Sequence, residues 1–339
     1  MIDKNSSTPC YVQLADIIRK KIKTKEIRTG DMLDSESVMV KKYGIARLTV
    51  REALNILVNE GLLEKRHGKG TFCKNAGLRK RIHVLLDVTD YYFVPYYMRS
   101  IGSVVASNNA DLIACDTCNS NDRICEYLEM ICKNGSDGVI IQGSPSPKIN
   151  KERMLNALHN LDDMEIPYVI IDAGYDFFDS SYIIPDESSS GAMAAKYFKE
   201  NNHSKILCVC VDNNNLSEKR LKGFSEVLPD FNAVYNDSRM GDRLISYIKN
   251  GVTGIFCFND YVAKQVLDIL EVKNLSVPND VSLISVDDTI IAEIYNLTSV
   301  THPKEKIGKE AADLMFNGKL NTKKVYSPKL AVRKSVKKL

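Results

Sequence analysis

Long apolar segments are absent from this 339-residue sequence. No run of about 18 consecutive apolar residues occurs, so nothing in it predicts a membrane-spanning helix. The N-terminus, Met-Ile-Asp-Lys-Asn, also lacks the apolar stretch of a signal peptide. We therefore expect a cytoplasmic protein with no membrane partner. Apolar residues still make up 44% of the chain, which is enough for two or three domains with their own cores.

The motifs of several large enzyme classes are absent as well. The sequence has no Gly-x-Gly-x-x-Gly or Gly-x-x-x-x-Gly-Lys loop for phosphates, no Gly-x-Ser-x-Gly nucleophile and no His-Glu-x-x-His zinc motif. No lysine lies in a recognisable pyridoxal-phosphate context. We therefore expect neither an enzyme nor a bound cofactor.

The nine cysteines are an odd number for a disulfide framework, and they fit a reducing compartment. Cys115, Cys118, Cys125 and Cys132 could supply four thiolates to zinc, and the Cys-x-x-Cys pair could be redox-active. Cys115, however, ends an apolar strand pattern, and Cys125 and Cys132 lie on the apolar stripe of the next predicted helix. Core packing is the simpler interpretation, so we predict no metal site, and metal binding by this group stays open.

Negative charge is scarce only in the first part of the chain. Residues 1–81 contain 18 Lys and Arg against 9 Asp and Glu, a net charge of +9, whereas the remaining 258 residues carry 28 against 34, a net charge of −6. A compact basic segment is typical of a protein that neutralises phosphates, although a solvated basic surface is the alternative.

The basic segment has the pattern of three helices and a hairpin. The first helix is amphipathic, Ser35 is a suitable N-cap for the second, and Gly44 ends it. The glycines of the last turn permit a tight hairpin. The predicted elements are helices at Pro9–Ile22, Glu36–Tyr43 and Leu48–Asn59, and strands at Leu62–Arg66 and Thr71–Lys74. Together they predict a winged helix-turn-helix.

The third helix has the pattern of a DNA-reading helix. Its apolar positions form one face, while Arg47, Thr49 and Arg51 project from another at the helix start. Each arginine can present a guanidinium fork to guanine or phosphate, and the threonine can contact phosphate or a thymine methyl. The alternative for Arg51 is a surface ion pair with Glu52 or Glu60.

These residues resemble the GntR family of bacterial regulators. The resemblance covers residues 9 to 73 and rests on Gly30-Asp31, Ser35-Glu36, Arg47 to Leu54 and Gly68 to Phe72. The chain departs from the family at Asp34, Ser37 and Ala46, where Pro, a DNA-contacting Arg and Ser or Thr are common. The resemblance implies a double-stranded, palindromic operator that a dimer reads, with contacts from the wing to the minor groove. The implied DNA-binding residues are Ser35, Arg47, Thr49, Arg51, His67, Gly68, Lys69 and Gly70.

After residue 81 the pattern changes to alternating strands and helices. Nearly continuous apolar strands that alternate with helices predict an α/β fold with parallel sheets covered on both faces. The predicted strands are Ile82–Leu86, Leu112–Ala114, Gly138–Ile141, Tyr168–Asp172, Lys205–Val211, Gly254–Phe258 and Val281–Val286. The predicted helices include Ile124–Lys133, Met154–Leu161, Ala192–Glu200 and Val262–Val272. The number of strands suits two sheets.

The residues that follow the predicted strands are polar and aromatic. Examples are the segment Asp87 to Tyr97, Asp116 to Asn119, Ser144, Asn259-Asp260 and Asp287-Asp288. Ligands of open parallel sheets gather at these carboxyl ends. Hydroxyl-bonding groups beside tyrosine and phenylalanine rings suit a sugar, whereas the alternative is that the strand ends are simply solvated.

This region resembles the effector domain of the Lac repressor family, which shares its fold with periplasmic sugar-binding proteins. The most specific stretch is Pro278 to Asp288, supported by Arg220 to Phe224, Phe258 to Asp260 and Leu297 to Pro303. The resemblance implies two lobes around a sugar site. From the strand ends and this resemblance together, the expected effector-binding residues are Asp90, Tyr96, Asp116, Ser144, Arg220, Asn259, Asp287 and His302.

The resemblances imply a winged helix-turn-helix domain at 1–75, a linker at 76–81 and a two-lobed domain at 82–335. Lobe 1 would hold about 82–184 and 303–326, and lobe 2 about 186–301 and 328–335, with three crossings that form a hinge. A GntR-like head on this domain is the arrangement of arabinose-repressor-like regulators. We therefore expect a homodimeric repressor of sugar-utilisation genes that responds to a pentose or related sugar. A fusion with a sugar-modifying enzyme, or a sugar sensor without DNA binding, is the alternative.

Overall fold

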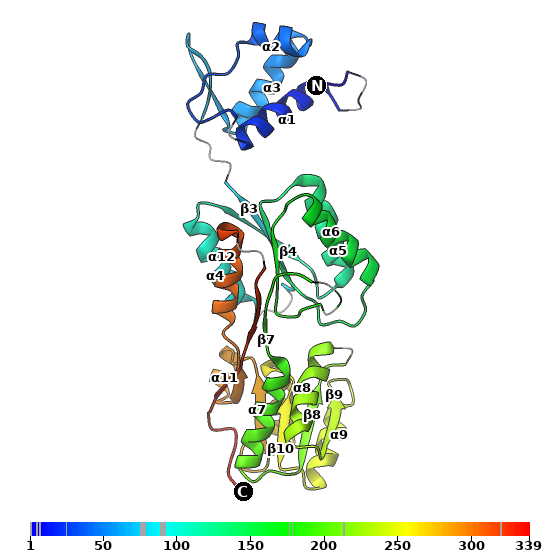
Figure 1. The fold of residues 1–339 in the computed structure, drawn as a ribbon. Coiled ribbons are helices and arrows are strands. Elements are labelled where there is room, and N and C mark those ends of the chain that lie inside the picture. Colours follow the sequence, from blue (N-terminus) through cyan, green and yellow to red (C-terminus); the bar gives the residue numbers. More distant parts are fainter. Residues whose placement is uncertain are drawn as a thin grey trace. The chain divides into compact units, whose positions relative to one another are not determined.

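The computed structural model describes residues 2–4, 6, 8–24, 26–74, 79–88, 93–175, 177, 179–212, 214–318 and 321–339. The chain divides into two compact units, residues 1–79 and residues 80–339 (Figure 1). No helix within these described ranges is long and apolar enough to cross a membrane.

The first unit contains three helices and a two-stranded hairpin, as predicted. The Ser35 side chain accepts a hydrogen bond from the Val38 backbone N–H and so caps the second helix, which Gly44 ends in the left-handed conformation, with a φ of 64°. The first and third helices pack together through Leu14, Ile18 and other buried side chains. The elements are α1 (Cys10–Lys23), α2 (Glu36–Tyr43), α3 (Arg47–Asn59), β1 (Leu63–Arg66) and β2 (Gly70–Cys73).

The second unit contains two six-stranded sheets. The first sheet has the order β13-β7-β6-β5-β3-β4, and all its neighbouring strands are parallel. Its strands are β3 (Arg81–Leu86), β4 (Asp111–Asp116), β5 (Gly138–Gln142), β6 (Tyr168–Ile171), β7 (Tyr182–Pro185) and β13 (Lys323–Tyr326). We call this sheet and its helices lobe 1.

The second sheet has the order β14-β12-β11-β10-β8-β9, and only β14 runs antiparallel to its neighbour. Its strands are β8 (Ile206–Cys210), β9 (Phe231–Tyr235), β10 (Gly254–Cys257), β11 (Ser282–Val286), β12 (Thr298–Thr301) and β14 (Lys329–Ala331). We call this sheet and its helices lobe 2. The predicted α/β fold, a helix-turn-helix followed by two parallel-sheet lobes, is confirmed.

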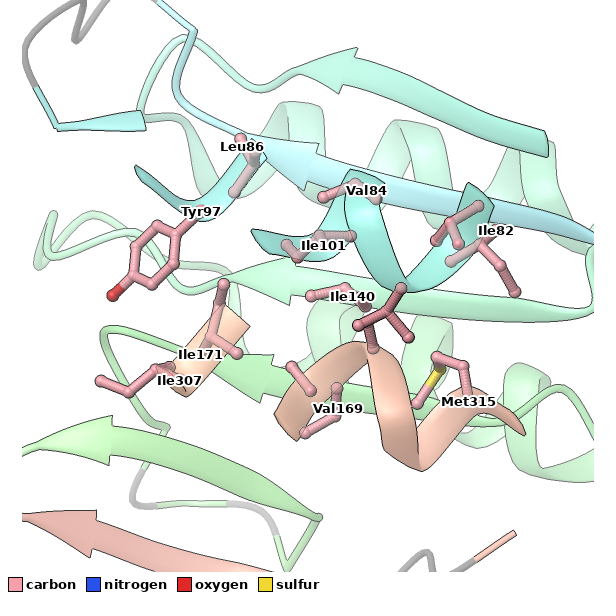
Figure 2. Close-up of a cluster of buried hydrophobic side chains, with 14 of the residues drawn as sticks. Ile82, Val84, Leu86, Tyr97, Ile101, Ile140, Val169, Ile171, Ile307 and Met315 are labelled. Atoms are coloured by element: carbon pink, nitrogen blue, oxygen red, sulfur yellow. The ribbon is translucent and has the colours of Figure 1, made fainter. Parts of the chain in front are cut away.

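Helices cover both faces of each sheet. In lobe 1, α4 and α12 pack on one face, where Ile101 and Met315 meet Val84, Ile140 and Val169 of the strands (Figure 2). The opposite face is covered by α5 and α6. In lobe 2, α9, α10 and α11 cover one face, and α7 and α8 cover the other. The helices are α4 (Val94–Ser107), α5 (Asn121–Asn134), α6 (Lys151–Asp163), α7 (Glu187–Glu200), α8 (Asn215–Val227), α9 (Met240–Lys249), α10 (Asp260–Val272), α11 (Ile290–Ile294) and α12 (Lys304–Asn317).

The chain passes between the two sheets three times. Residue 186 joins β7 to α7, residues 302–303 join β12 to α12, and residues 327–328 join β13 to β14. Each connection is only one or two residues long, which is the arrangement of a hinge between two lobes.

The seven predicted strands of this unit are all present, and the structure adds elements that the sequence pattern did not indicate. The sequence analysis places the segment Asp87 to Tyr97 at the ligand end of a strand and predicts no helix there, but α4 begins inside this segment at Val94, with Pro95 in its first turn. This places Tyr97, expected at the ligand site, in the core with no exposed surface. The added strands β7, β9, β12, β13 and β14 are short, and β9, β13 and β14 lie at sheet edges.

Candidate functional site

The start of α3 carries two arginines that converge on one glutamate of α2. Arg47 Nε lies 3.0 Å from Glu36 Oε2, and Arg51 Nη2 lies 3.1 Å from the same oxygen. The side chains remain 67% and 50% exposed. Hydrogen bonds from Arg51 and Arg47 lower the pKa of the Glu36 carboxyl. The two guanidinium groups are thus held side by side on an accessible surface.

The alternative prediction for Arg51, an ion pair with Glu52 or Glu60, is wrong, because Arg51 pairs with Glu36. Glu60 instead pairs with Arg19 of α1, at 2.7 Å between Nη2 and Oε1. The pairing follows from the helix packing, because α1 and α3 lie in contact and α2 contacts α3. The arginines of α3 therefore meet α2, and Glu60, at the end of α3, meets α1.

The other predicted DNA-binding residues also lie on the surface of the first unit. Thr49 is half-buried beside the two arginines, and Ser35 is exposed at the start of α2. The wing tip, His67 to Gly70, is exposed throughout. Gly68 and Gly70 have φ angles of 68° and 115°, which explains why the turn needs glycine. The wing tip therefore exposes its backbone and the Lys69 side chain, and the two glycines add no side chains that would cover them.

The second unit has a cavity of about 200 Å³ between the lobes. It lies beyond the carboxyl ends of β3, β4, β5, β6, β8, β10 and β11, where open parallel sheets bind ligands. Lobe 1 contributes Asp87, Phe93, Thr117, Asn119, Gln142, Gly143, Ser144, Pro145 and Asp172, and lobe 2 contributes Val211, Asn214, Leu216, Arg220, Phe258, Asn259 and Asp287. At its edge the Asn215 backbone N–H donates to the Pro145 carbonyl at 2.8 Å, so the lobes touch directly.

Arg220 of α8 is the central cation of the cavity. Its Nε donates to Glu187 Oε2 at 2.5 Å, its Nη1 donates to the Phe258 carbonyl, and its Nη2 lies 3.9 Å from Asp287 Oδ1. Arg220 and Glu187 are each only 5% exposed. Burial disfavours the charge of Glu187, yet Arg220 and His302 outweigh it and hold the pKa of this carboxyl below its ordinary value. Arg220 is therefore fixed in place while part of its fork faces the cavity.

Two carboxyl groups of the cavity are pushed toward their protonated forms. Burial raises the pKa of Asp287 to about 8, against the opposing effect of Arg220. Burial raises the pKa of Asp172 to about 6, and the Gln142 amide, which donates to Asp172 at 2.8 Å, opposes it. Both residues have positive φ angles, 104° for Asp287 and 70° for Asp172. Such backbone is uncommon outside glycine and collects at functional sites.

Stability between about pH 6.5 and pH 8 is expected to depend on Asp287. Because its folded pKa of about 8 lies above the ordinary 3.8, the folded state keeps a proton that the unfolded chain has released, so the free energy of unfolding falls as pH rises. Asp172, with a pKa of about 6, adds to the fall mainly below this window. His302, whose pKa burial lowers to about 4, opposes the fall at the lower end of the window, because the unfolded imidazole releases its proton near pH 6.5. Asp287→Asn should remove the fall, which is on the order of 1 kcal/mol per pH unit. Urea unfolding across the window measures it, and an unchanged slope in the variant contradicts the assignment.

The structure brings together half of the predicted effector residues. Ser144, Arg220, Asn259 and Asp287 line the cavity. Asp90 lies outside the described residues.

The other three predicted effector residues make contacts beside the cavity. Asp116 Oδ1 accepts from the backbone N–H groups of Val88 and Cys118. His302 Nε2 lies 3.0 Å from Ser190 Oγ. Tyr96 lies under the ammonium group of Lys304. None of the three is among the lining residues.

The polar residues that sequence reasoning missed include Gln142, Asp172 and Glu187. Gln142 joins a backbone to a carboxyl group of the cavity, because its Oε1 accepts from the Asp87 backbone N–H at 3.0 Å while its amide donates to Asp172 Oδ2. Asp172 ends an apolar strand, and this was the available signal. Glu187 lies in the first turn of α7, five residues before the predicted start of that helix.

The cysteine group is divided between core and surface. Cys115 and Cys125 are buried against Ile124 and Leu128, and burial raises their pKa values, that of Cys125 to about 11. Cys118 is exposed and lies 3.2 Å from Asp116 Oδ2. Among the residues with described positions, no three His, Cys, Asp or Glu side chains are arranged to hold a metal ion. Core packing accounts for the buried pair.

Comparison with known proteins finds a family match within each unit. Residues 10–73 match the family of bacterial regulatory proteins called the gntR family, and residues 195–336 match the periplasmic binding protein-like domain. The chain combines a GntR-type DNA-binding domain with a periplasmic-binding-protein-like domain. Figure 1 shows these as the helical unit with α1 to α3 and the unit with the two sheets.

Two relatives extend over nearly the whole chain. Both are named arabinose metabolism transcriptional repressor. The one from Halalkalibacterium halodurans is 27% identical and covers 94% of each chain. The one from Geobacillus stearothermophilus is 25% identical and covers 99% of this chain and 100% of its own length. Both relatives are transcriptional regulators by name.

The lobed unit also resembles solved structures. A LacI family transcriptional regulator from Enterococcus faecalis with bound ribose is 25% identical, has a TM-score of 0.65 and covers 77% of this chain and all of its own. A periplasmic binding protein/LacI transcriptional regulator from Alkaliphilus metalliredigens, complexed with D-xylulofuranose, covers 76% of this chain and 99% of its own. It has a TM-score of 0.63 at 22% identity, which supports the fold alone.

Proposed function

We propose that this protein is a dimeric transcriptional repressor whose binding to operator DNA is controlled by a small sugar in the cavity between its lobes. The carrying observation is the polar cavity at the strand ends, with Arg220, Asn259 and Asp287 on its lobe 2 side, in a chain that also carries a GntR-type DNA-binding domain. The two arabinose repressors that match almost the full length favour a pentose. Such a regulator works where bacterial DNA is, in the cytoplasm.

The chemistry of the cavity supports a sugar. A monosaccharide needs donors and acceptors for its hydroxyl groups and an apolar surface for its C–H groups. Arg220 and the side-chain amides supply donors, Asp87 and Asp172 supply acceptors, and Phe93 and Phe258 supply ring surface. The cavity volume of about 200 Å³ suits a small ligand. One sugar ring is the ligand that this space suits.

The three short connections between the lobes can explain how sugar binding controls DNA binding. A sugar that contacts both lobes favours one relative arrangement of the lobes, and in a dimer this arrangement sets whether two DNA-binding domains match two half-sites. We propose that the DNA contacts come from Ser35, Arg47, Thr49, Arg51 and the wing tip, and that no catalysis takes place in the cavity. Turnover of a bound sugar would contradict the last point.

A thermal-shift screen tests the sugar. Pentoses, deoxyhexoses and their phosphates are compared, because a ligand at about 100 times its Kd stabilises the folded state by about 2.7 kcal/mol. We expect at least one pentose to raise the melting temperature and to change the affinity for a palindromic DNA fragment. The absence of any stabilising sugar would remove the proposed ligand class.

Arg51→Ala tests the DNA surface. The variant loses a fork that can reach guanine or phosphate, so we expect its operator affinity to fall by about 1 to 3 kcal/mol. Fluorescence anisotropy with the operator fragment at fixed salt measures the change. Arg19→Ala is the matched control, because it also loses an ion pair at the surface, with Glu60, but lies on α1. Equal affinity of Arg51→Ala and the wild type would exclude Arg51 from the interface.

A further inference from the structure

Lys304 is a buried cation between the cavity wall and lobe 1. It is the first residue of α12 and is only 4% exposed. A buried ammonium group is costly unless polar groups meet its charge. Here its Nζ donates to the backbone carbonyl of Asp287, a residue that lines the cavity. One side of the ammonium group is therefore fixed to the loop of lobe 2 that forms the cavity wall.

The other contacts of Lys304 are two aromatic rings of lobe 1. Its Nζ lies 5.4 Å from the centre of the Phe93 ring and 5.3 Å from that of the Tyr96 ring. Cations are attracted to the faces of such rings, more strongly where water is excluded. Phe93 precedes α4 and Tyr96 lies in its first turn. Lys304 thus joins the Asp287 loop to the start of α4.

Tyr96 extends this connection back to lobe 2. Its hydroxyl group forms a hydrogen bond with the backbone of Ile290, at the start of α11. Asp287, Lys304, Tyr96 and Ile290 therefore form a continuous series of contacts across the two lobes. A movement of the Asp287 loop cannot leave the start of α4 unaffected while these contacts hold.

Helix α4 in turn packs on the strand that follows the DNA-binding domain in sequence. The side chains of Tyr97 and Ile101 in α4 belong to the same buried cluster as those of Val84 and Leu86 in β3 (Figure 2). Strand β3 begins at Arg81, close in sequence to the end of the first unit at Arg79. The contacts of Lys304 thus lead from the cavity wall to the strand nearest in sequence to the DNA-binding domain.

From this geometry we propose that Lys304 is a positioning residue that couples sugar binding to DNA binding. It transmits a displacement of the Asp287 loop to α4 and β3 without contacting the sugar, since it is not among the residues that line the cavity. The proposal rests on the proposed function, in which a sugar controls the affinity for DNA. It assigns the coupling to a contact that can be removed while the lining residues stay in place.

Lys304→Met tests the coupling, because methionine keeps an unbranched side chain but removes the charge. The probe is L-arabinose, and the operator affinity is measured without sugar and at saturating sugar. We expect arabinose affinity within about threefold of the wild type, but a ratio of the two operator affinities that is about tenfold smaller. A wild-type ratio, or a loss of arabinose binding of the same size as the loss of coupling, overturns the proposal.

Lys306→Met is the matched control. Lys306 lies on the same helix and also over an aromatic ring, that of Tyr326 at 5.2 Å, but it is exposed. Its arabinose affinity and its ratio should equal those of the wild type. A second variant, Tyr96→Leu, removes the ring and hydroxyl group that face Lys304 and Ile290 at a half-buried position. It should reduce the ratio by about threefold even if Lys304→Met does not fold, and an unchanged ratio again overturns the proposal.

A measurement without sugar separates this proposal from the proposed function. If arabinose and the other pentoses leave the operator affinity of the wild type unchanged, sugar control fails, and hydrogen exchange of the unliganded full chain decides the role of Lys304. Faster exchange of α4 and of the Asp287 loop in Lys304→Met than in Lys306→Met supports the connection. Equal exchange in the two variants overturns it.

Discussion

Arg220→Met is expected to abolish sugar binding and to lower the free energy of unfolding by about 3 to 5 kcal/mol. The arginine is 5% exposed and is the partner of the equally buried Glu187. Its removal leaves a carboxylate without its main cation and the Phe258 carbonyl without its donor. The cavity also loses its central hydrogen-bond donor. Urea unfolding measures the stability, and calorimetry with the pentose found by thermal shift measures the binding.

The double variant Arg220→Met/Glu187→Gln separates the two effects. It removes the buried negative charge together with its partner, so it should be more stable than Arg220→Met alone, although it still cannot bind the sugar. This distinction matters because a merely unstable single variant would also fail to bind. A single variant within about 1 kcal/mol of the wild type would show that Glu187 is well solvated or protonated without Arg220, contrary to its burial.

Gly223→Ala is expected to cost about 3 kcal/mol of stability and to weaken sugar binding. Helices α7 and α8 cross in backbone contact at two glycines. A Cβ atom on Gly223 would lie 1.8 Å from the Ser188 carbonyl oxygen, and one on Gly191 would lie 1.8 Å from that of Arg220. Neither oxygen belongs to a flexible side chain, so the helices must separate. Because α7 carries Glu187 and α8 carries Arg220, their separation disturbs the cation of the cavity.

Gly241→Ala is the matched control for this variant. Gly241 also lies in a helix of lobe 2, α9, but its added Cβ would meet only the Ile269 side chain, at 3.8 Å. That is ordinary contact, and alanine favours a helix by about 0.8 to 1 kcal/mol over glycine. The control should keep or gain stability and bind sugar normally. Equal urea midpoints of Gly223→Ala and the wild type would contradict the close approach of α7 and α8.

The strands that the sequence predicted are those with continuous apolar runs. Ile206–Cys210 and Tyr168–Ile171 are buried on both faces, so apolar side chains occupy every position of these strands. The missed edge strands β9, β13 and β14 lack this signal. Phe231–Tyr235 has one fully buried residue, Val234, and three exposed ones, and its pairing with β8 depends on residues far away in the sequence. Helix α4 was missed because its tyrosines were interpreted as ligand-site residues after a strand, whereas the fold turns Tyr97 inward.

Residues of the cavity could be predicted from the sequence only where a polar residue directly follows an apolar strand. Asn259 and Asp287 follow apolar strands, and the rule for parallel sheets places them at the ligand end. Glu187 has no such signal, because a glutamate in the first turn of a helix is ordinarily a solvated residue. Its burial depends on the backbone contact between α7 and α8, which no local pattern reveals. In the same way, Glu36 becomes the partner of Arg47 and Arg51 only after α2 packs on α3.

The three crossings have a consequence for synthesis on the ribosome. Lobe 1 precedes lobe 2 in the chain, yet its sheet lacks strand β13 until residue 326 has emerged, and the sheet of lobe 2 lacks β14 until residue 331 has emerged. Helix α12, which covers one face of lobe 1, is also made only after most of lobe 2. Neither lobe can therefore be completed during most of translation, in contrast to the DNA-binding domain, which is made first as a continuous segment. A nascent chain of this protein would thus present a finished DNA-binding head before the domain that regulates it exists.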